Sequence, residues 1–234
     1  AYRSGAAFDT IHLNDLAHVN LDRYKVIVFA FTPFLSADHV ATIKNRVQTP
    51  GRTVVWVYAP GYTDGETLET SRIGAVTGIE ISQSDIQLPP ELVIRQNALA
   101  PDFPETRVPV EIQDAWTAPT FQVTDANATP LGYYGGSRDV ALARKNVNGV
   151  DTWYCALPLK HPGIMREIFR HGGAHIYNDA NDVLFAGGGV LCIHTETGGE
   201  RTIRLSPDCE RLLQLEPFAT VLLDTETGKP LLGP

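Results

Sequence analysis

Two apolar runs separated by an amphipathic stretch constrain the fold of this chain more than any other part of its sequence. Lys25–Phe31 is a nearly continuous apolar run rich in β-branched residues, which is typical of a strand covered on both faces. Ser36–Val47 begins with a serine suited to a helix N-cap and spaces its apolar residues along one face, and Thr53–Tyr58 is a second apolar run. Because the connections are short, we expect a parallel, right-handed β-α-β unit.

The turn after the second run has the position of an active site but lacks its chemistry. Ala59-Pro60-Gly61 directly follows Thr53–Tyr58, at the carboxyl end of a strand, where open α/β sheets usually bind their ligands. Hydrolases and amidotransferases of this build carry Ser or Cys in such a turn, the nucleophile elbow. The sequence therefore predicts an enzyme-like scaffold without its nucleophile.

Two more helices and several short strands are expected along the rest of the chain. Helices are predicted over Thr67–Thr77 and over His161–His171, which has Pro162 in its first turn. Before the last helix, strands are predicted at Phe8–Leu13, Phe121–Val123, Leu131–Tyr134, Val140–Lys145 and Val150–Leu157. Asn146–Gly149 is a turn signal that joins the last two strands as a hairpin. After the last helix, strands are predicted at Ala174–Tyr177, Val183–Ala186, Val190–His194, Arg201–Leu205 and Thr220–Leu223.

These patterns together predict an α/β protein with a mostly parallel sheet, helices on both faces and a small antiparallel β segment at the end. We expect an α/β domain over residues 1–178 and a β-rich segment over residues 179–234. Residues 79–120 carry many prolines, so we expect only short edge strands and loops there.

Charge and cysteine content exclude several classes of function. The net charge is −8 and the basic residues form no stripe, so we expect neither a nucleic-acid partner nor a membrane-binding patch. No apolar run approaches the ~20 residues of a membrane-spanning helix, and no signal-peptide pattern is found at Ala1. We expect a soluble protein of unassigned compartment. The three cysteines form no C-x-x-C pair, so no metal or redox cofactor is predicted, and Cys155 and Cys192 are expected to be buried.

The order of elements resembles the class I glutamine-amidotransferase-like fold, of flavodoxin-like build. It is more specifically similar to the noncatalytic version found in bacterial glycoside hydrolases, the β-galactosidase trimerisation domain. The resembling stretches are FDTIHLNDLAHVNLDRYKVIVFAFTPFLSADHVATIKNRV, GRTVVWVYAPGYTDG, DTWYCALPL and GGAHIYNDANDVLFAGGGVLCIHTETGGERTIRLS. That family has one more strand and helix before the segment at Phe8, so the resemblance implies a domain whose first strand is missing and that belongs to a longer protein.

The resemblance also implies that both catalytic partners of an active amidotransferase are absent. The elbow cysteine of that family falls at Ala59-Pro60, and the histidine after its late strand falls near Leu157. Without a nucleophile and its base, acyl transfer has no mechanism. His161 lies four residues further on, in the expected helix cap, and does not replace the lost histidine.

Four residues at the elbow are the weak candidates for a ligand pocket. Tyr58, Tyr62, Asp64 and Glu66 lie at or just after the turn, where a sugar or metal site could use them. The alternative is a polar loop in which Asp64-Gly65 forms a turn. No catalytic residue is predicted, because the sequence does not pair two carboxylates at the spacing that glycoside hydrolysis needs.

Three other groups of residues are expected to be structural. His171 and His175 are separated by two glycines that end the helix, so their helical ligand spacing is lost and no metal site is predicted. Asp179, Asn181 and Asp182 resemble half of a calcium loop but are expected to form a turn. Trp116 and Phe121 are candidates for a sugar-stacking or subunit-contact surface, with core packing as the alternative.

The first functional hypothesis is a noncatalytic accessory or oligomerisation domain of a bacterial glycoside hydrolase, acting in carbohydrate metabolism. Its partners would be a catalytic barrel domain of the same protein, identical subunits or both. One alternative is a carbohydrate-binding or sensing module that uses the elbow pocket. The other is an independent hydrolase with an unusual site at Asp64 and Glu66.

Overall fold

The computed structural model describes residues 1–110 and 119–232, so Trp116, a candidate for a contact surface or for core packing, lies outside the described part. The chain forms two compact units, one of residues 11–159 and one of residues 1–10 together with 160–234. The predicted domain boundary at residue 178 stays a prediction. Within the described residues, no helix has the length and apolar character needed to cross a membrane.

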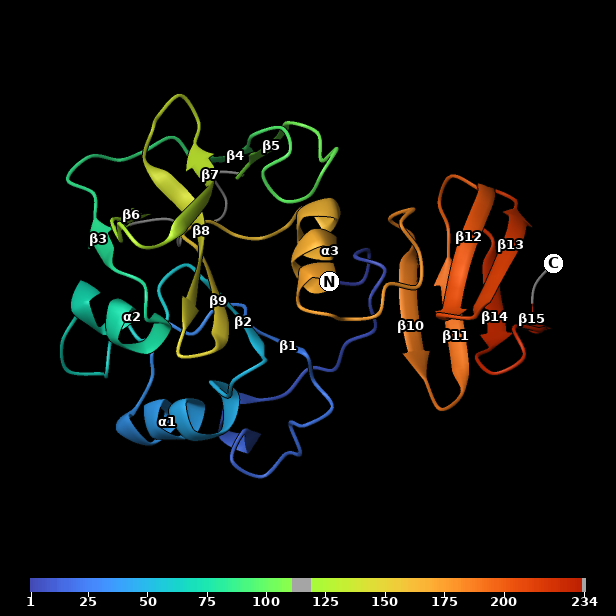
Figure 1. Cartoon of the computed structure of the whole chain (residues 1–234), viewed down its shortest axis with the longest axis horizontal. Coiled ribbons are helices and arrows are strands. Elements are labelled where there is room, and N and C mark those ends of the chain that lie inside the picture. Colours follow the sequence, from blue (N-terminus) through green and yellow to red (C-terminus); the bar gives the residue numbers. More distant parts are fainter. Residues whose placement is uncertain (111–118, 233–234) are drawn as a thin grey trace. The chain divides into compact units, whose positions relative to one another are not determined.

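The unit of residues 11–159 contains the predicted β-α-β motif (Figure 1). Strand β1 (Val26–Phe29) pairs in parallel with β2 (Thr53–Val57), with Val26 opposite Thr53, and α1 (Ala37–Thr42) lies between them in the chain. The Ser36 hydroxyl accepts a hydrogen bond from the His39 N–H, and the His39 ring accepts one from the Ser36 N–H, which satisfies two N-terminal donors of the helix. The parallel β-α-β prediction is confirmed.

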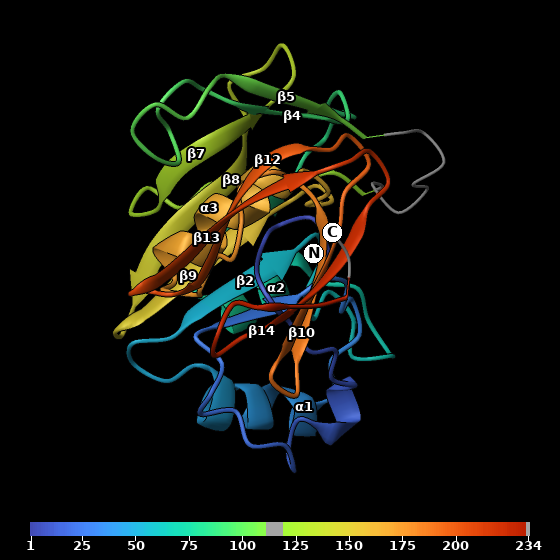
Figure 2. The same cartoon turned by 90° about the vertical axis from the view of Figure 1, so that its right-hand side faces the viewer.

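The main sheet is mixed and largely antiparallel, so the prediction of a mostly parallel sheet is wrong. Its strand order is β1-β2-β9-β8-β7-β4-β5, and β3 and β6 join it through β8. Only β1, β2 and β9 (Val150–Cys155) pair in parallel among the described strands. Strand β8 (Val140–Val147) reaches β9 through a tight turn, and such a short connection permits only antiparallel pairing. The sequence of strands can be followed in Figure 2, where β2, β9, β8 and β7 are labelled.

The hairpin between β8 and β9 has the geometry that its turn residues favour. Asn148 and Gly149 both adopt left-handed backbone conformations, with φ of 53° and 85°, as a two-residue hairpin turn of this kind requires. The Asn146 side chain accepts a hydrogen bond from the Gly149 N–H. This hairpin prediction is confirmed.

The remaining elements of this unit are short. Among its described residues, the other helical elements are a 3₁₀ turn at Leu13–Asp15, a wider turn at Ile43–Val47 that continues α1, and α2 at Thr70–Thr77. The other strands of this described part are β3 (Ile81–Gln83), β4 (Glu91–Ile94), β5 (Thr106–Pro109), β6 (Phe121–Val123) and β7 (Thr129–Tyr134). Strand β2 is buried along its whole length, which places it at the core of this unit.

The second unit combines one helix with small antiparallel sheets. Helix α3 (Pro162–His171) is followed by the sheet β10-β11-β14-β15, whose strands are Val183–Gly187, Val190–His194, Thr220–Asp224 and Pro230–Leu232. Strands β12 (Gly199–Ser206) and β13 (Cys209–Leu215) form a separate two-stranded sheet. Leu184, Leu191, Ile203 and Leu223 are among the fully buried residues of its core. The predicted antiparallel β segment is confirmed.

Two predicted strands do not form, and two that form were not predicted. Phe8–Leu13 has no strand pairing and runs into the 3₁₀ turn, and Ala174–Tyr177 follows α3 as irregular chain. Strands β13 and β15 were missed by the sequence prediction. A short apolar run does not specify whether a neighbouring strand is available to it, so these errors concern tertiary pairing.

Candidate functional site

The elbow, defined as Tyr58–Gly61, has left-handed backbone at Tyr58 and at Gly61, and Tyr58 lies one position before the Ala59-Pro60 turn. Tyr58 has φ of 67°, which is uncommon and costly for a bulky residue. Two hydrogen bonds hold it there: its N–H donates to the Cys155 carbonyl at 2.7 Å, and its carbonyl accepts from the Tyr154 hydroxyl at 2.5 Å. The neighbouring strand β9 therefore maintains the backbone shape of an elbow.

The side chain of Tyr58, the first residue of the elbow, is buried among aromatic rings. The residue is 5% exposed, and its ring packs against Phe31 and edge-on against Phe121, with centroid distances of 6.2 and 5.5 Å. Its hydroxyl donates to the Pro119 carbonyl at 3.0 Å. Burial, and to a smaller extent the nearby Tyr62, raise the pKa of Tyr58 to about 12. This phenol stays protonated near neutral pH and is engaged in packing.

The other predicted pocket residues separate into an aromatic pair and a turn. Tyr62 packs edge-on against Phe121 at 5.1 Å, so the structure brings it together with Tyr58 around one ring. Asp64 accepts hydrogen bonds from the N–H groups of Glu66 and Thr67, both at 3.1 Å. These bonds, that of Thr67 first, hold the pKa of Asp64 below its ordinary value.

Asp64 is also paired with a helix side chain. The Arg72 guanidinium lies 2.5 Å from the second carboxylate oxygen of Asp64, while Glu66 is exposed. The geometry is that of the turn-forming aspartate expected as the alternative for this loop. The use of Tyr58, Tyr62, Asp64 and Glu66 as a ligand pocket stays a prediction.

The late strand adds no base or nucleophile to the elbow. Cys155 and Leu157 are buried, and burial raises the pKa of the Cys155 thiol to about 12, so the reactive thiolate is disfavoured. His161 is the N-cap of α3, where its Nδ1 accepts a hydrogen bond from the Ile164 N–H at 3.3 Å. Burial and the charge of Arg166 lower the pKa of His161, which favours the neutral ring that this cap requires.

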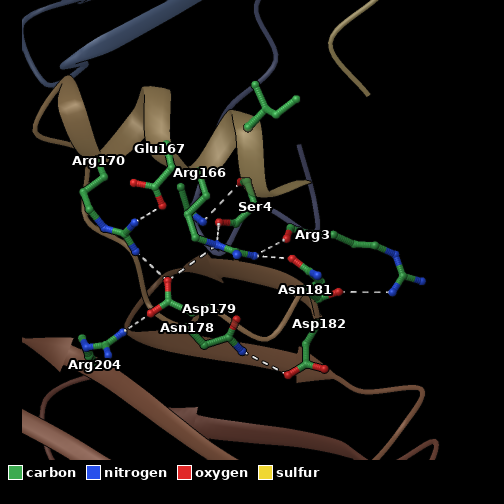
Figure 3. A network of polar contacts seen from close by, with 12 residues as sticks. Arg3, Ser4, Arg166, Glu167, Arg170, Asn178, Asp179, Asn181, Asp182 and Arg204 are labelled. Carbon is green, nitrogen blue, oxygen red and sulfur yellow. Dashed lines mark hydrogen bonds and ion pairs between the residues drawn. The ribbon is translucent and has the colours of Figure 1, made fainter. Parts of the chain in front are cut away.

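A second polar region lies in the other unit, where only a turn was expected. We call Arg166, Arg170, Asp179 and Arg204 the arginine–aspartate cluster (Figure 3). Asp179 accepts from Arg170 at 2.6 Å and from Arg204 at 2.8 Å, and Arg166 lies 3.7 Å away. Partial burial alone raises the pKa of Asp179, but the hydrogen bond from Arg204 and the charges of the other arginines outweigh it and lower this pKa.

Arg166 connects α3 to the first residues of the chain by hydrogen bonds. This arginine is 7% exposed and donates to the carbonyls of Ser4 and Arg3 at 2.9 and 3.1 Å. It also donates to the Asn181 side chain at 2.5 Å, as Figure 3 shows. A buried guanidinium needs such partners, so Arg166 holds the loop 178–182 in place at Asn181.

Asp182, on the same loop, forms a buried ion pair with Arg201 of β12. Arg201 donates to both carboxylate oxygens of Asp182, at 2.7 and 3.3 Å, and to the hydroxyl of Thr195 at 2.7 Å. Both charged side chains are nearly buried, at 3% and 8% exposure. The acidic residues that resembled a calcium loop are thus neutralised by arginines. Among the described residues, no three His, Cys, Asp or Glu side chains are grouped to hold a metal ion.

Sequence reasoning missed the arginine–aspartate cluster, although one signal was present. Arg166 and Arg170 are four residues apart in a predicted helix, so they share a face, and an acidic loop follows shortly after the helix ends. Arg204 comes from β12, and its arrival at Asp179 depends on tertiary structure.

No protein-family model matches the chain, and no curated protein matches it. Solved structures do match in fold. The β-galactosidase from Bacillus circulans sp. alkalophilus matches with a TM-score of 0.60 and 17% identity, over 99% of this chain and 34% of that one. The cold-adapted β-galactosidase from Rahnella sp. R3 matches with a TM-score of 0.60 and 16% identity, over 94% of this chain and 34% of that one. A Thermoplasma acidophilum protein proposed to be part of a GMP synthase has a TM-score of 0.40 and 12% identity, over 65% of this chain and 72% of that one.

The similarity to β-galactosidases that was predicted from the sequence is confirmed at the level of the fold. The chain spans about a third of the length of the β-galactosidases that it matches. It therefore has the fold of one region of these β-galactosidases.

Proposed function

We propose that this chain is a noncatalytic accessory or oligomerisation domain of a glycoside hydrolase. The observation that carries the proposal is Tyr58, a buried, protonated side chain at the elbow where an enzyme of this build would hold its nucleophile. The fold similarity to part of longer β-galactosidases supports the same conclusion. The hydrolytic chemistry would then belong to a barrel domain of the parent protein.

An exposed apolar patch beside the elbow supports a contact with such a partner. Phe31, Phe34 and Leu68 are 49%, 46% and 67% exposed. Bridges from Phe34 to Thr63 and from Thr63 to Leu68 place these segments side by side. Exposed aromatic and aliphatic side chains gathered on one surface mark interaction sites more often than isolated ones do. The partner would be a barrel domain of the same protein, an identical subunit or both.

Hydrolysis assays test the noncatalytic part of the proposal. We expect the chain alone to give no rate above buffer on o-nitrophenyl β-galactoside and β-xyloside. A measurable rate that is lost in Asp64→Ala or Glu66→Ala would contradict the proposal and favour an independent hydrolase at this loop.

Association measurements test the partner surface. We expect sedimentation velocity to show self-association of the chain, or binding to the barrel domain of its parent protein. Replacing Phe31, Phe34 and Leu68 by serine should abolish it. Ile86→Ser is the control, since Ile86 is as exposed as Leu68, at 67%, but lies in a different segment. An equal loss of association in Ile86→Ser would show that Phe31, Phe34 and Leu68 do not form a specific contact surface.

A further inference from the structure

A groove in the unit formed by residues 1–10 and 160–234 has chemistry that the proposed function does not use. It has a volume of about 390 Å³ and is lined by α3, the loop after it, and the β12–β13 hairpin. Its size falls in the ~300–1,000 Å³ range of small-molecule sites. Arg170, Asp179 and Arg204 of the arginine–aspartate cluster line it, together with His175, Ile176 and Glu210.

The charges that line the groove are balanced. Arg170 and Arg204 both contact the carboxylate of Asp179, and Arg204 also lies 3.7 Å from Glu210. Two guanidinium groups therefore face two carboxylates. An anionic ligand would have to compete with Asp179 and Glu210, and a cationic ligand would meet the arginines. The electrostatics favour a neutral ligand.

The polar groups alternate between donors and acceptors. Each guanidinium has five N–H donors, and a carboxylate offers about four acceptor directions. Arg170, Asp179 and Arg204 are 45%, 45% and 42% exposed at their side chains, so their mutual bonds leave part of each group facing solvent. A hydroxyl both donates and accepts hydrogen bonds. Adjacent hydroxyls of one ligand could therefore accept from an arginine and donate to Asp179.

His175 and Ile176 complete this pattern. The His175 Nε2 lies 2.7 Å from the Arg204 carbonyl, which only accepts, so Nε2 carries the hydrogen and Nδ1 is an acceptor in the neutral ring. Ile176 contributes an apolar wall next to these polar groups. Such a lining suits a ligand with hydroxyls along its edge and C–H groups on its face.

We propose that this groove binds a neutral polyhydroxylated ligand, namely a sugar. The proposal does not depend on the accessory role: hydrolysis and association measurements test that role, and the groove is tested by ligand binding. It also differs from the elbow hypothesis, because the elbow belongs to the unit of residues 11–159.

Amide chemical shifts of the isotope-labelled chain are to be titrated with the methyl glycosides of galactose, glucose and xylose. We expect saturable shifts at α3 and β12 with at least one glycoside at up to about 50 mM, well above a ~1 mM dissociation constant. Galacturonate and galactosamine are the matched anionic and cationic probes, and both should bind more weakly than the neutral galactoside. Absence of saturable shifts with all three glycosides overturns the proposal. Tighter binding of galacturonate overturns it in favour of an anion site.

Substitutions of the two lining arginines test whether these side chains bind the sugar. Arg204→Gln should weaken binding about tenfold, the effect of losing a hydrogen bond to a charged group. Arg170→Lys keeps the charge but loses the planar fork, so it should also weaken binding without altering the charge balance. Arg107→Gln removes an arginine from an exposed ion pair in the unit of residues 11–159; it is the control and should bind as the parent does. Unchanged affinity in both arginine variants, or loss in the Arg107→Gln control alone, overturns the assignment.

Discussion

The elbow and the arginine–aspartate cluster both include a residue of an irregular segment, Tyr58 and Asp179, but the surroundings of these two residues are opposite in polarity. At the elbow, Tyr58 is inserted among aromatic rings and its hydroxyl donates to a backbone carbonyl. At the cluster, Asp179 is half exposed and lies among three arginines. The position that resembles an active site is thus packed with apolar groups, whereas the turn after α3 carries charged groups that face solvent.

This difference shows that position in the fold and capacity for chemistry are separate properties. Hydrogen bonds from β9 hold the left-handed backbone of Tyr58 at the elbow. The cluster has its capacity because four ionisable side chains from α3, the loop 178–182 and β12 converge there. A retained backbone shape is therefore weak support for a retained reaction.

The largest expected effect separates the buried from the exposed part of the loop 178–182. Asp182→Ala should lower the free energy of unfolding by about 3–5 kcal/mol, because it leaves Arg201 buried without its partner. Asp179→Ala, at an exposed ion pair, should cost only about 0–1 kcal/mol. Hydrogen exchange of the backbone amides in β11 and β12 measures the loss of stability in each variant. Equal effects would show that burial does not distinguish the two aspartates.

Tyr58→Phe tests whether the elbow hydroxyl is structural. Removing it leaves the Pro119 carbonyl without its donor, and we expect a loss of about 1 kcal/mol in urea unfolding. Tyr62→Phe is the matched control, since its hydroxyl makes only a 3.4 Å contact with Gln83 and should matter less. A gain of stability in Tyr58→Phe would indicate that the hydroxyl is kept for another purpose.

Alkaline titration should weaken the elbow. The folded pKa of Tyr58 is about 12, above its ordinary 10, and burial raises the pKa of Tyr154 as well. Between pH ~10 and ~12, Tyr58 loses its proton in the unfolded chain but keeps it in the folded chain. The free energy of unfolding therefore falls as the pH rises through this range. Melting temperatures across this range should fall less steeply in Tyr58→Phe. Parallel curves for the two proteins would contradict the expectation.

Acid titration should weaken the cluster, with the smallest effect. The pKa of Asp179 is lowered in the folded state, so its stabilisation is present above its ordinary pKa and is lost as the pH falls through the folded value. Asp179→Asn should therefore differ from the parent by less than about 1 kcal/mol at neutral pH, and not at all in strong acid. Added salt should reduce the difference. A difference that persists in acid would point to packing instead of charge.

Local signals in the sequence predicted local structure well. Ser36 starts α1, Pro162 starts α3 and Asn148-Gly149 turns the hairpin, because caps and turns depend on the conformational preferences of a few adjacent residues. The proline-rich stretch gave no such signals. Its strands β4 and β5 pair antiparallel beside β7, and together with the antiparallel pairs β7–β8 and β8–β9 they make the sheet largely antiparallel.

The sequence by itself determined the β-α-β unit, the late helix and hairpin, and the absence of Ser or Cys from the elbow. Only the tertiary structure decided that Phe121 and Pro119 would enclose Tyr58, and that Arg204 would join Arg170 at Asp179. The physical reason is the range of the forces involved. Caps and turns are set between near neighbours in the chain, whereas aromatic packing and ion pairs depend on which distant segments the sheets bring side by side.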